Sequence, residues 1–149
     1  MREILFRGKR TDCGEWVEGY LNQHRGRVIF DCCCNAINAN DYYINDWTEK
    51  LDTDLYGCVY KVDPETVGQF TGLTDKNGVK IFEGDIIQSL ESSVTGLVQW
   101  FPEHSAFMVW CKSANEVGFL YECAYIIKVI GNIHDNPGLL EGGGCDGII

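Results

Sequence analysis

The chain has 149 residues, 45% of them hydrophobic and 12% aromatic, so it can build an apolar core in one or two small domains. Its net charge is −10, which disfavours nucleic acid as a partner, because phosphate contacts need clustered lysine or arginine. No apolar run approaches the roughly 18 residues of a membrane span, and the charged start MREILFRGKR does not fit a signal peptide. We therefore expect a protein of the bacterial cytoplasm.

The N-terminal residues predict an antiparallel meander. Alternating side chains favour strands over residues 3–9, 15–21 and 27–31, with turns at residues 12–14 and 24–26. On the second of these strands Trp16 and Tyr20 share a face. They form either a stacking surface for a ligand or partner, or ordinary packing across the sheet.

Residues 35–60 have the weakest pattern in the chain. Asn40, Asp41, Asn45 and Asp46 can serve as helix caps or turn residues. The run from Tyr42 to Ile44, followed by Trp47 and Leu51, fits one or two short helical turns. Residues 57–62 then predict a short strand, and we expect the link between two units at residues 62–65.

The central stretch, residues 67–85, has the sequence VGQFTGLTDKNGVKIFEGD. Its alternation predicts two strands joined either by a turn at Asp75–Gly78, with Gly78 in the left-handed region, or by a two-residue turn on Asn77–Gly78. A second tight turn follows at residues 83–85, and Ile86 begins the next strand.

The longer motif DPETVGQFTGLTDKNGVKIFEGDII resembles the signature of the YopX-like family of phage and prophage proteins, and MREILFRGKR and VIGNIHDNPGLL resemble the ends of that family. The resemblance implies a small β-rich protein with an SH3-like barrel, and it implies no known activity. We therefore expect a mainly β fold with little helix. It should comprise a meander with an irregular or helical segment over residues 1–62, an SH3-like small barrel over residues 63–140 and a flexible tail over residues 141–149.

Residues 97–101 and 106–110 predict a hairpin with Phe101 opposite Ala106 and Trp100 opposite Phe107. Both faces of this hairpin are apolar, and a small barrel buries only one face of its sheet. The other face needs cover from residues 35–60 or from a second copy, and we expect a homo-oligomer. The residues of this predicted contact face are Leu97, Phe101, Met108 and Trp110.

The end of the chain predicts a short strand or turn at residues 116–123 and a last strand at residues 125–133. A turn at residues 135–138 then precedes the glycine-rich tail.

No catalytic, cofactor-binding or metal-binding pattern occurs in the sequence. It has no paired-histidine zinc motif, no G-x-S-x-G elbow and no phosphate-binding glycine loop. The eight cysteines contain no C-x-x-C pair, so we interpret them as small buried apolar residues of a reducing cytosol. An enzyme is therefore the less favoured interpretation.

Three functions remain open. The first is a non-enzymatic phage or prophage accessory module that binds an unknown protein partner. The second is a metal-assisted hydrolase that uses Asp63, Glu65, Asp75 or Asp85, although such residues more often serve turns. The third is an acidic mimic of DNA that inhibits a host protein, based on the acidic residues that are densest from 41 to 65.

Overall fold

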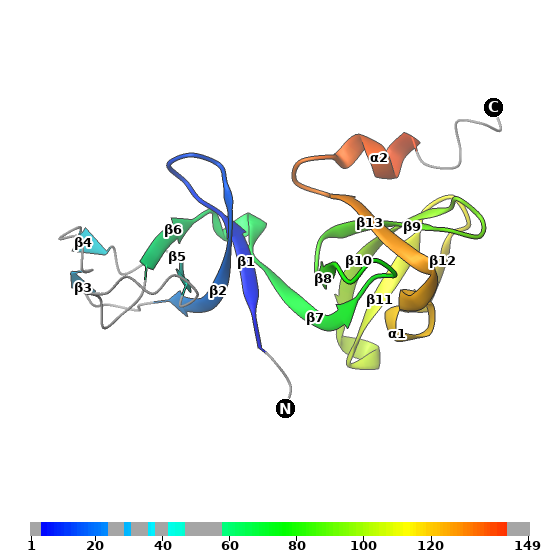
Figure 1. The fold of residues 1–149 in the computed structure, drawn as a ribbon, viewed down its shortest axis with the longest axis horizontal. Helices are drawn as coiled ribbons and strands as arrows, with labels where there is room; N and C mark the ends of the chain where they lie inside the picture. The colour runs from blue at the N-terminus through cyan, green and yellow to red at the C-terminus, as the bar shows by residue number, and fades with distance from the viewer. Residues whose placement is uncertain (1–3, 24–28, 31–35, 38–41, 47–57, 143–149) are drawn as a thin grey trace. The chain divides into compact units, whose positions relative to one another are not determined.

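The computed structural model describes residues 4–23, 29–30, 36–37, 42–46 and 58–142 (Figure 1). As predicted, the fold is mainly β with little helix. The chain divides into two compact units, residues 1–69 and 70–149. Strand β7 (Gly68–Thr74) spans this boundary, whereas the predicted boundary after residue 62 lies earlier, before β7 begins.

The first unit is built on an antiparallel sheet. Strand β1 (Phe6–Lys9) lies between β2 (Trp16–Gln23) and the first residues of β7. On its other side β2 pairs with β5 (Tyr42–Asp46), which in turn pairs with β6 (Cys58–Val62). A Cβ at Gly8 would lie 3.0 Å from the Cβ of the buried Val62, so glycine allows this close approach.

Two sequence predictions for this unit are wrong. The strand expected at residues 27–31 appears as β3 (Ile29–Phe30), but it pairs with β4 (Ala36–Ile37) and not with β2. The helical turns expected around Tyr42–Ile44 are instead strand β5, which is paired on both sides. Tyrosine and isoleucine suit a strand, and two ladders of hydrogen bonds outweigh the local capping signals. Trp47 and Leu51 lie outside the described residues.

A short 3-10 turn, η1 (Pro64–Thr66), ties the end of β6 to β1. The Thr66 hydroxyl donates to the Asp63 carbonyl at 2.7 Å and accepts from the Lys9 backbone N–H at 2.9 Å. The Asp63 N–H in turn donates to the Lys9 carbonyl at 2.9 Å. Thr66 is buried, so these bonds are largely protected from water.

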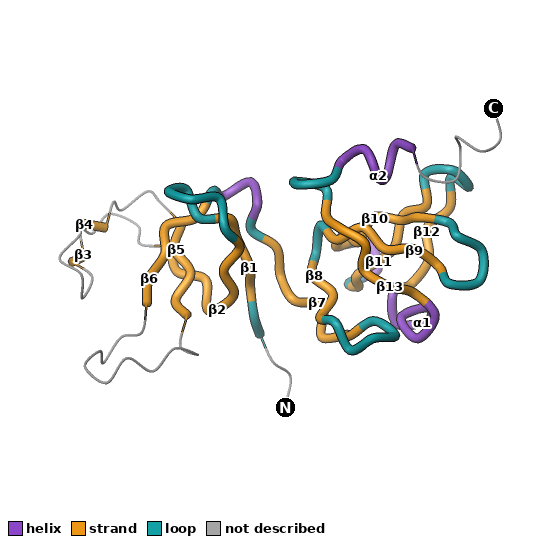
Figure 2. The backbone as a smooth tube through the Cα atoms, turned by 45° about the horizontal axis from the view of Figure 1, so that its top comes forward, coloured by secondary structure: helices purple, strands orange, loops and turns teal. Residues whose placement is uncertain are grey.

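The second unit contains the predicted SH3-like barrel, an antiparallel sheet curled into a half-barrel (Figure 2). The predicted hairpin register is confirmed, with Phe101 opposite Ala106 and Trp100 opposite Phe107. Strand β8 (Lys80–Phe82) pairs with the end of β7. The sheet order is β12 (Glu116–Phe119), β11 (Ala106–Cys111), β10 (Thr95–Phe101), β9 (Asp85–Ser89) and β13 (Ile127–Asn132).

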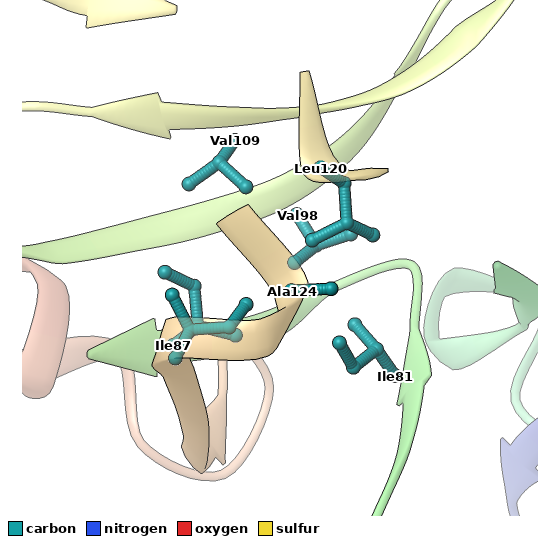
Figure 3. Packing of buried hydrophobic residues seen from close by; sticks show 7 residues of the cluster. Ile81, Ile87, Val98, Val109, Leu120 and Ala124 are labelled. Carbon is teal, nitrogen blue, oxygen red and sulfur yellow. The ribbon is translucent and has the colours of Figure 1, made fainter. Parts of the chain in front are cut away.

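Alternate residues of this sheet enter two separate apolar clusters, as period-two side chains must. The larger cluster is shown in Figure 3 and contains Ile81, Ile87, Val98, Val109, Leu120, Ala124 and Ile127. The smaller cluster lies on the other face and joins Ile86 and Leu97 to Leu140. Trp110, Ile130 and Ile133 pack against this smaller cluster.

Four short helical segments complete the described part of the second unit. These are η2 (Pro102–His104), α1 (Leu120–Cys123), η3 (Ala124–Ile126) and α2 (Pro137–Gly142). Helix α2 was not expected, since the sequence predicted a turn over residues 135–138; Pro137 instead occupies the first helical position. Within the described residues, no helix has the length and apolar character needed to cross a membrane.

Candidate functional site

Asp75 is a buried carboxylate of the second unit that accepts three backbone N–H groups. Its Oδ1 accepts the backbone N–H groups of Asn77 at 2.8 Å and Val79 at 2.9 Å. Its Oδ2 accepts the N–H of Val129 in β13 at 2.9 Å. The side chain is only 6% exposed. Asp75 therefore organises the turn between β7 and β8 and attaches that turn to a strand far along the chain.

Asp85 closes the second tight turn of the central stretch. It is 1% exposed, and its Oδ2 accepts the Phe82 N–H at 2.8 Å. Gly84 has a φ of 92° within this turn, a conformation that strains other residues. The Gly84 N–H donates to the Val98 carbonyl at 2.8 Å, and its own carbonyl accepts the Ile133 N–H at 2.9 Å. This turn thus links β8 to β9 and bonds through its backbone to β10 and to the residue that follows β13.

The other carboxylates considered for metal chemistry lie in the first unit. Asp63 caps η1, because its Oδ1 accepts the Glu65 N–H at 3.1 Å. Glu65 itself is exposed. In the part of the chain that the structure describes, no three His, Cys, Asp or Glu side chains come together as ligands for a metal ion. The geometry assigns Asp63, Asp75 and Asp85 to turns.

Aromatic rings gather around the β10–β11 hairpin and the start of α1. Trp100 and Phe107 meet edge to face with ring centroids 5.0 Å apart. The ring of Phe119 lies 5.8 Å from His104 and 5.4 Å from Tyr121. Trp100 is 42% exposed and Tyr121 is 63% exposed. Phe119 lies opposite Met108, so the strand register places it on the other face of the sheet from Trp100 and Phe107. We call His104, Phe119 and Tyr121 the aromatic surface.

The predicted contact face divides into a covered part and a partly open part. Leu97 and Met108 are buried, and Leu140 of the unexpected helix α2 packs in the same cluster as Leu97. Helix α2 therefore supplies cover that the sequence prediction had sought in residues 35–60 or in a second copy. Phe101 and Trp110 are half-buried, and their role in self-association stays a prediction.

Trp16 and Tyr20 lie in the first unit, apart in sequence from the aromatic surface. The Arg7 guanidinium carbon lies 4.8 Å from the centroid of the Trp16 ring, and the Lys9 Nζ lies 5.8 Å from it. These cation–π contacts involve Trp16 alone, and a stacking surface of Trp16 and Tyr20 stays a prediction. Tyr20 pairs with Asn45 of β5 in the strand register.

The sequence interpretation did not include His104, Phe119 and Tyr121 in a site. Phe119 and Tyr121 fell in a segment predicted only as a strand or turn, and His104 appeared as a lone turn residue. Their common location depends on the pairing of β11 with β12, which sets Phe119 opposite Met108. The available signal was two aromatic residues close together in a segment predicted as a short strand or turn.

The described thiols differ in their surroundings. Cys13 is exposed, whereas Cys111 and Cys123 are half-buried beside the larger apolar cluster. Burial raises the pKa of both the Cys111 and the Cys123 thiol, because an apolar environment disfavours the thiolate. In the first unit a hydrogen bond from Arg10 lowers the pKa of the Asp12 carboxyl, and the two groups form a bidentate ion pair.

Two known proteins are similar to parts or all of the chain. Protein EF1440 from Enterococcus faecalis has a solved crystal structure, with 25% sequence identity and a TM-score of 0.50 over 94% of this chain and 99% of that protein. A peptide-N(4)-(N-acetyl-beta-glucosaminyl)asparagine amidase of Gallus gallus is 30% identical over 59 residues. The match covers 40% of this chain and only 8% of the length of the chicken enzyme.

The likeness to the Enterococcus protein extends over both units, whereas the likeness to the amidase is confined to a small part of a much longer protein. A family model also covers most of the chain. The model described as "YopX protein" matches residues 5–141, from the start of the first sheet to the last described helix. The chain belongs to the YopX protein family.

Proposed function

We propose that this YopX-family protein is a non-enzymatic accessory protein of a phage or prophage, acting in the bacterial cytoplasm by binding another protein. The observation that carries the proposal is the aromatic surface of the second unit. Tryptophan and tyrosine are over-represented at protein interfaces, because their large rigid rings bury apolar area at a small entropic cost. Tyr121 of this surface is exposed in helix α1, and His104 is exposed in η2.

The charge of the chain indicates the chemistry of the partner. A protein with a net charge of −10 attracts a basic surface and repels an acidic one. Glu103 and Glu122 are exposed next to residues of the aromatic surface. The partner we propose is therefore a protein with an apolar patch surrounded by lysine and arginine.

The hydrogen bonds that the buried carboxylates of Asp75 and Asp85 accept support a binding role over hydrolysis. A general acid or a metal ligand needs oxygen atoms that are free to reach a substrate or an ion. Both carboxylate oxygens of Asp75 are engaged by backbone N–H groups, and Asp85 accepts the Phe82 N–H. These hydrogen bonds to the backbone explain why Asp75 and Asp85 are buried.

Affinity capture with the full chain tests the proposal, using lysate of the organism that carries the gene. We expect one basic protein to be retained by the wild type and lost with the double variant His104→Ala/Tyr121→Ala. Calorimetry with that purified protein should then show at least about a tenfold weaker affinity for the double variant, since each interface aromatic commonly contributes 1 kcal/mol or more. Val79→Ala removes an equally exposed side chain elsewhere in the unit and should leave binding unchanged.

The salt dependence of the same binding reaction distinguishes the related hypotheses. Affinity for a basic partner should fall as salt is raised, because exposed charges are screened. Binding that is insensitive to both the double variant and salt would contradict the proposed surface. Displacement of the partner by DNA would instead favour the DNA-mimic hypothesis, which stays a prediction because much of residues 41–65 lies outside the described part of the chain.

A further inference from the structure

The turn between β7 and β8 contains a pair of residues with covalent chemistry of its own. Among the asparagines of the chain, only Asn77 is followed by a glycine. In such a pair the glycine nitrogen can attack the side-chain carbonyl carbon of the asparagine and close a five-membered ring. Glycine has no Cβ that would crowd this ring, so the reaction is easiest at this kind of pair. Asn77 and Gly78 are both exposed.

The surroundings of this pair do not obstruct the reaction. The Asn77 side chain makes no hydrogen bond with the described part of the chain, so it is free to rotate towards the glycine nitrogen. Gly78 has a φ of 80°, and a Cβ built on it would meet no atom within 4 Å. Space is therefore available for the ring and for the water molecule that later opens it.

The closed turn nevertheless restrains the attacking nitrogen. The Gly78 N–H donates to the Asp75 carbonyl at 3.0 Å. Asp75 Oδ1 accepts the N–H groups on either side of it, from Asn77 at 2.8 Å and from Val79 at 2.9 Å. A carboxylate at this position disfavours the nitrogen anion that begins the attack, and its burial limits screening by solvent. Opening of the turn removes both restraints.

We propose that Asn77 is a nonenzymatic modification site, at which deamidation to aspartate and isoaspartate occurs when the turn organised by Asp75 opens. The Gly78 nitrogen forms a bond to Asn77 Cγ, the Cγ–Nδ2 bond breaks, and ammonia leaves with the proton of the Gly78 N–H. Water then opens the resulting succinimide ring. Cleavage of its Cγ–N bond yields aspartate, and cleavage of the original backbone C–N bond yields isoaspartate.

Neither product allows the turn to close as before. Isoaspartate adds a methylene group to the backbone between the two N–H groups that Asp75 Oδ1 accepts. Aspartate keeps the backbone length but adds a negative charge two positions from the buried Asp75 carboxylate. Asp75 Oδ2 also accepts the Val129 N–H at 2.9 Å, so either product loosens the attachment of the turn to β13. Deamidation thus makes a transient opening of the turn permanent.

The chemistry of this turn is independent of any binding partner, so the purified full chain is sufficient to test it. Incubation at pH 8 followed by peptide mapping measures the deamidation rate of each asparagine, and electron-transfer fragmentation distinguishes isoaspartate from aspartate. In concentrated urea we expect Asn77 to react faster than every other asparagine. In the folded wild type its rate should be at least about tenfold lower than in urea, because the closed turn restrains the Gly78 nitrogen.

Variants of Asp75 test its control of the reaction. Asp75→Ala should raise the native rate at Asn77 by at least about tenfold, because the turn loses two hydrogen bonds to a charged acceptor. Asp75→Asn keeps the Oδ1 acceptor without the charge and should react at an intermediate rate. Gly96→Ala is the control, since its new Cβ meets Val109 in the core and leaves the turn unchanged. With urea added until its stability equals that of Asp75→Ala, this control should react at nearly the wild-type rate.

Amide hydrogen exchange tests the consequence for β13. The Val129 amide should exchange faster in the deamidated protein than in the unmodified protein, because its acceptor is Asp75. Four results would each overturn the proposal. They are an Asn77 rate in urea no higher than that of the other asparagines, equal wild-type rates with and without urea, an Asp75→Ala rate no higher than that of Gly96→Ala at matched stability, and Val129 exchange that deamidation leaves unchanged.

Discussion

Removal of the Asp75 carboxylate should destabilise the second unit more than removal of any exposed carboxylate. In Asp75→Ala the backbone N–H groups of Asn77, Val79 and Val129 lose their acceptor. A hydrogen bond to a charged group contributes about 1.5–3 kcal/mol, and a buried donor without a partner costs about 1–3 kcal/mol. These ranges set the scale of the expected loss.

The three N–H groups do not contribute equally. Asn77 and Val79 are exposed, so water can replace much of what the carboxylate provides there. Val129 lies in the half-buried strand β13, where its N–H would lose its acceptor. We therefore expect Asp75→Ala to lower the free energy of unfolding by about 3 kcal/mol. In a unit of this size that corresponds to a decrease in Tm of roughly 10–20 °C.

Asp75→Asn should cost less, about 2 kcal/mol, because its Oδ1 can still accept the two turn amides while its Nδ2 faces the Val129 donor. Urea denaturation of the full chain, followed by tryptophan fluorescence, measures both variants. Glu103→Ala is the matched control, since it also removes one negative charge but from an exposed side chain. If Asp75→Ala were within about 0.5 kcal/mol of this control, the reasoning about the three hydrogen bonds would be refuted.

Two further variants test the packing, and one alkylation reaction tests the burial of the thiols. Gly96→Ala should cost about 1–3 kcal/mol in a thermal melt, because the new Cβ would lie 2.4 Å from Val109 Cγ1 in the core. Thr66→Val should cost about 1–3 kcal/mol, since the buried hydroxyl both donates and accepts between η1 and β1. Iodoacetamide at pH 8 should modify Cys13 faster than Cys123, whose pKa burial raises, so that less thiolate is present in the folded protein. Peptide mapping by mass spectrometry measures these rates.

Each of these tests has an internal control. Gly118→Ala also introduces a methyl group in a strand, but it meets no atom within 4 Å and should be nearly neutral. Thr74→Val changes an exposed threonine and should have little effect. In urea the cysteine rates should converge, because unfolding removes the burial that separates them. Equal effects of Gly96→Ala and Gly118→Ala would contradict the packing argument, and equal native rates would contradict the thiol argument.

The sequence by itself determined the hairpin of the half-barrel. Pro102 opens a four-residue connection, and apolar residues on both sides allow one register that keeps Val98 and Val109 on the same face. The turn from Asp75 to Gly78 was also predictable, because an Asx side chain and a left-handed glycine are local signals. In both cases the interacting residues are close in sequence.

Only the tertiary structure decided the partners of β2 and the existence of α2. Strand β2 pairs with β5, some twenty residues away, across a segment whose local signals favoured turns. Helix α2 has six residues, too few for a stable isolated helix, so the burial of Leu140 beside Ile86 and Leu97 must stabilise it. Local propensity carries no information about such distant partners.

The site residues also depend partly on local sequence and partly on the tertiary structure. The aromatic character of Phe119 and Tyr121 is visible in the chain, but their proximity to His104 exists only once β12 pairs with β11. The role of Asp75 in its own turn follows from sequence, whereas its bond to Val129 spans 54 positions. That bond lies on the outer edge of β13, and which strands become edges is decided only when the sheet assembles.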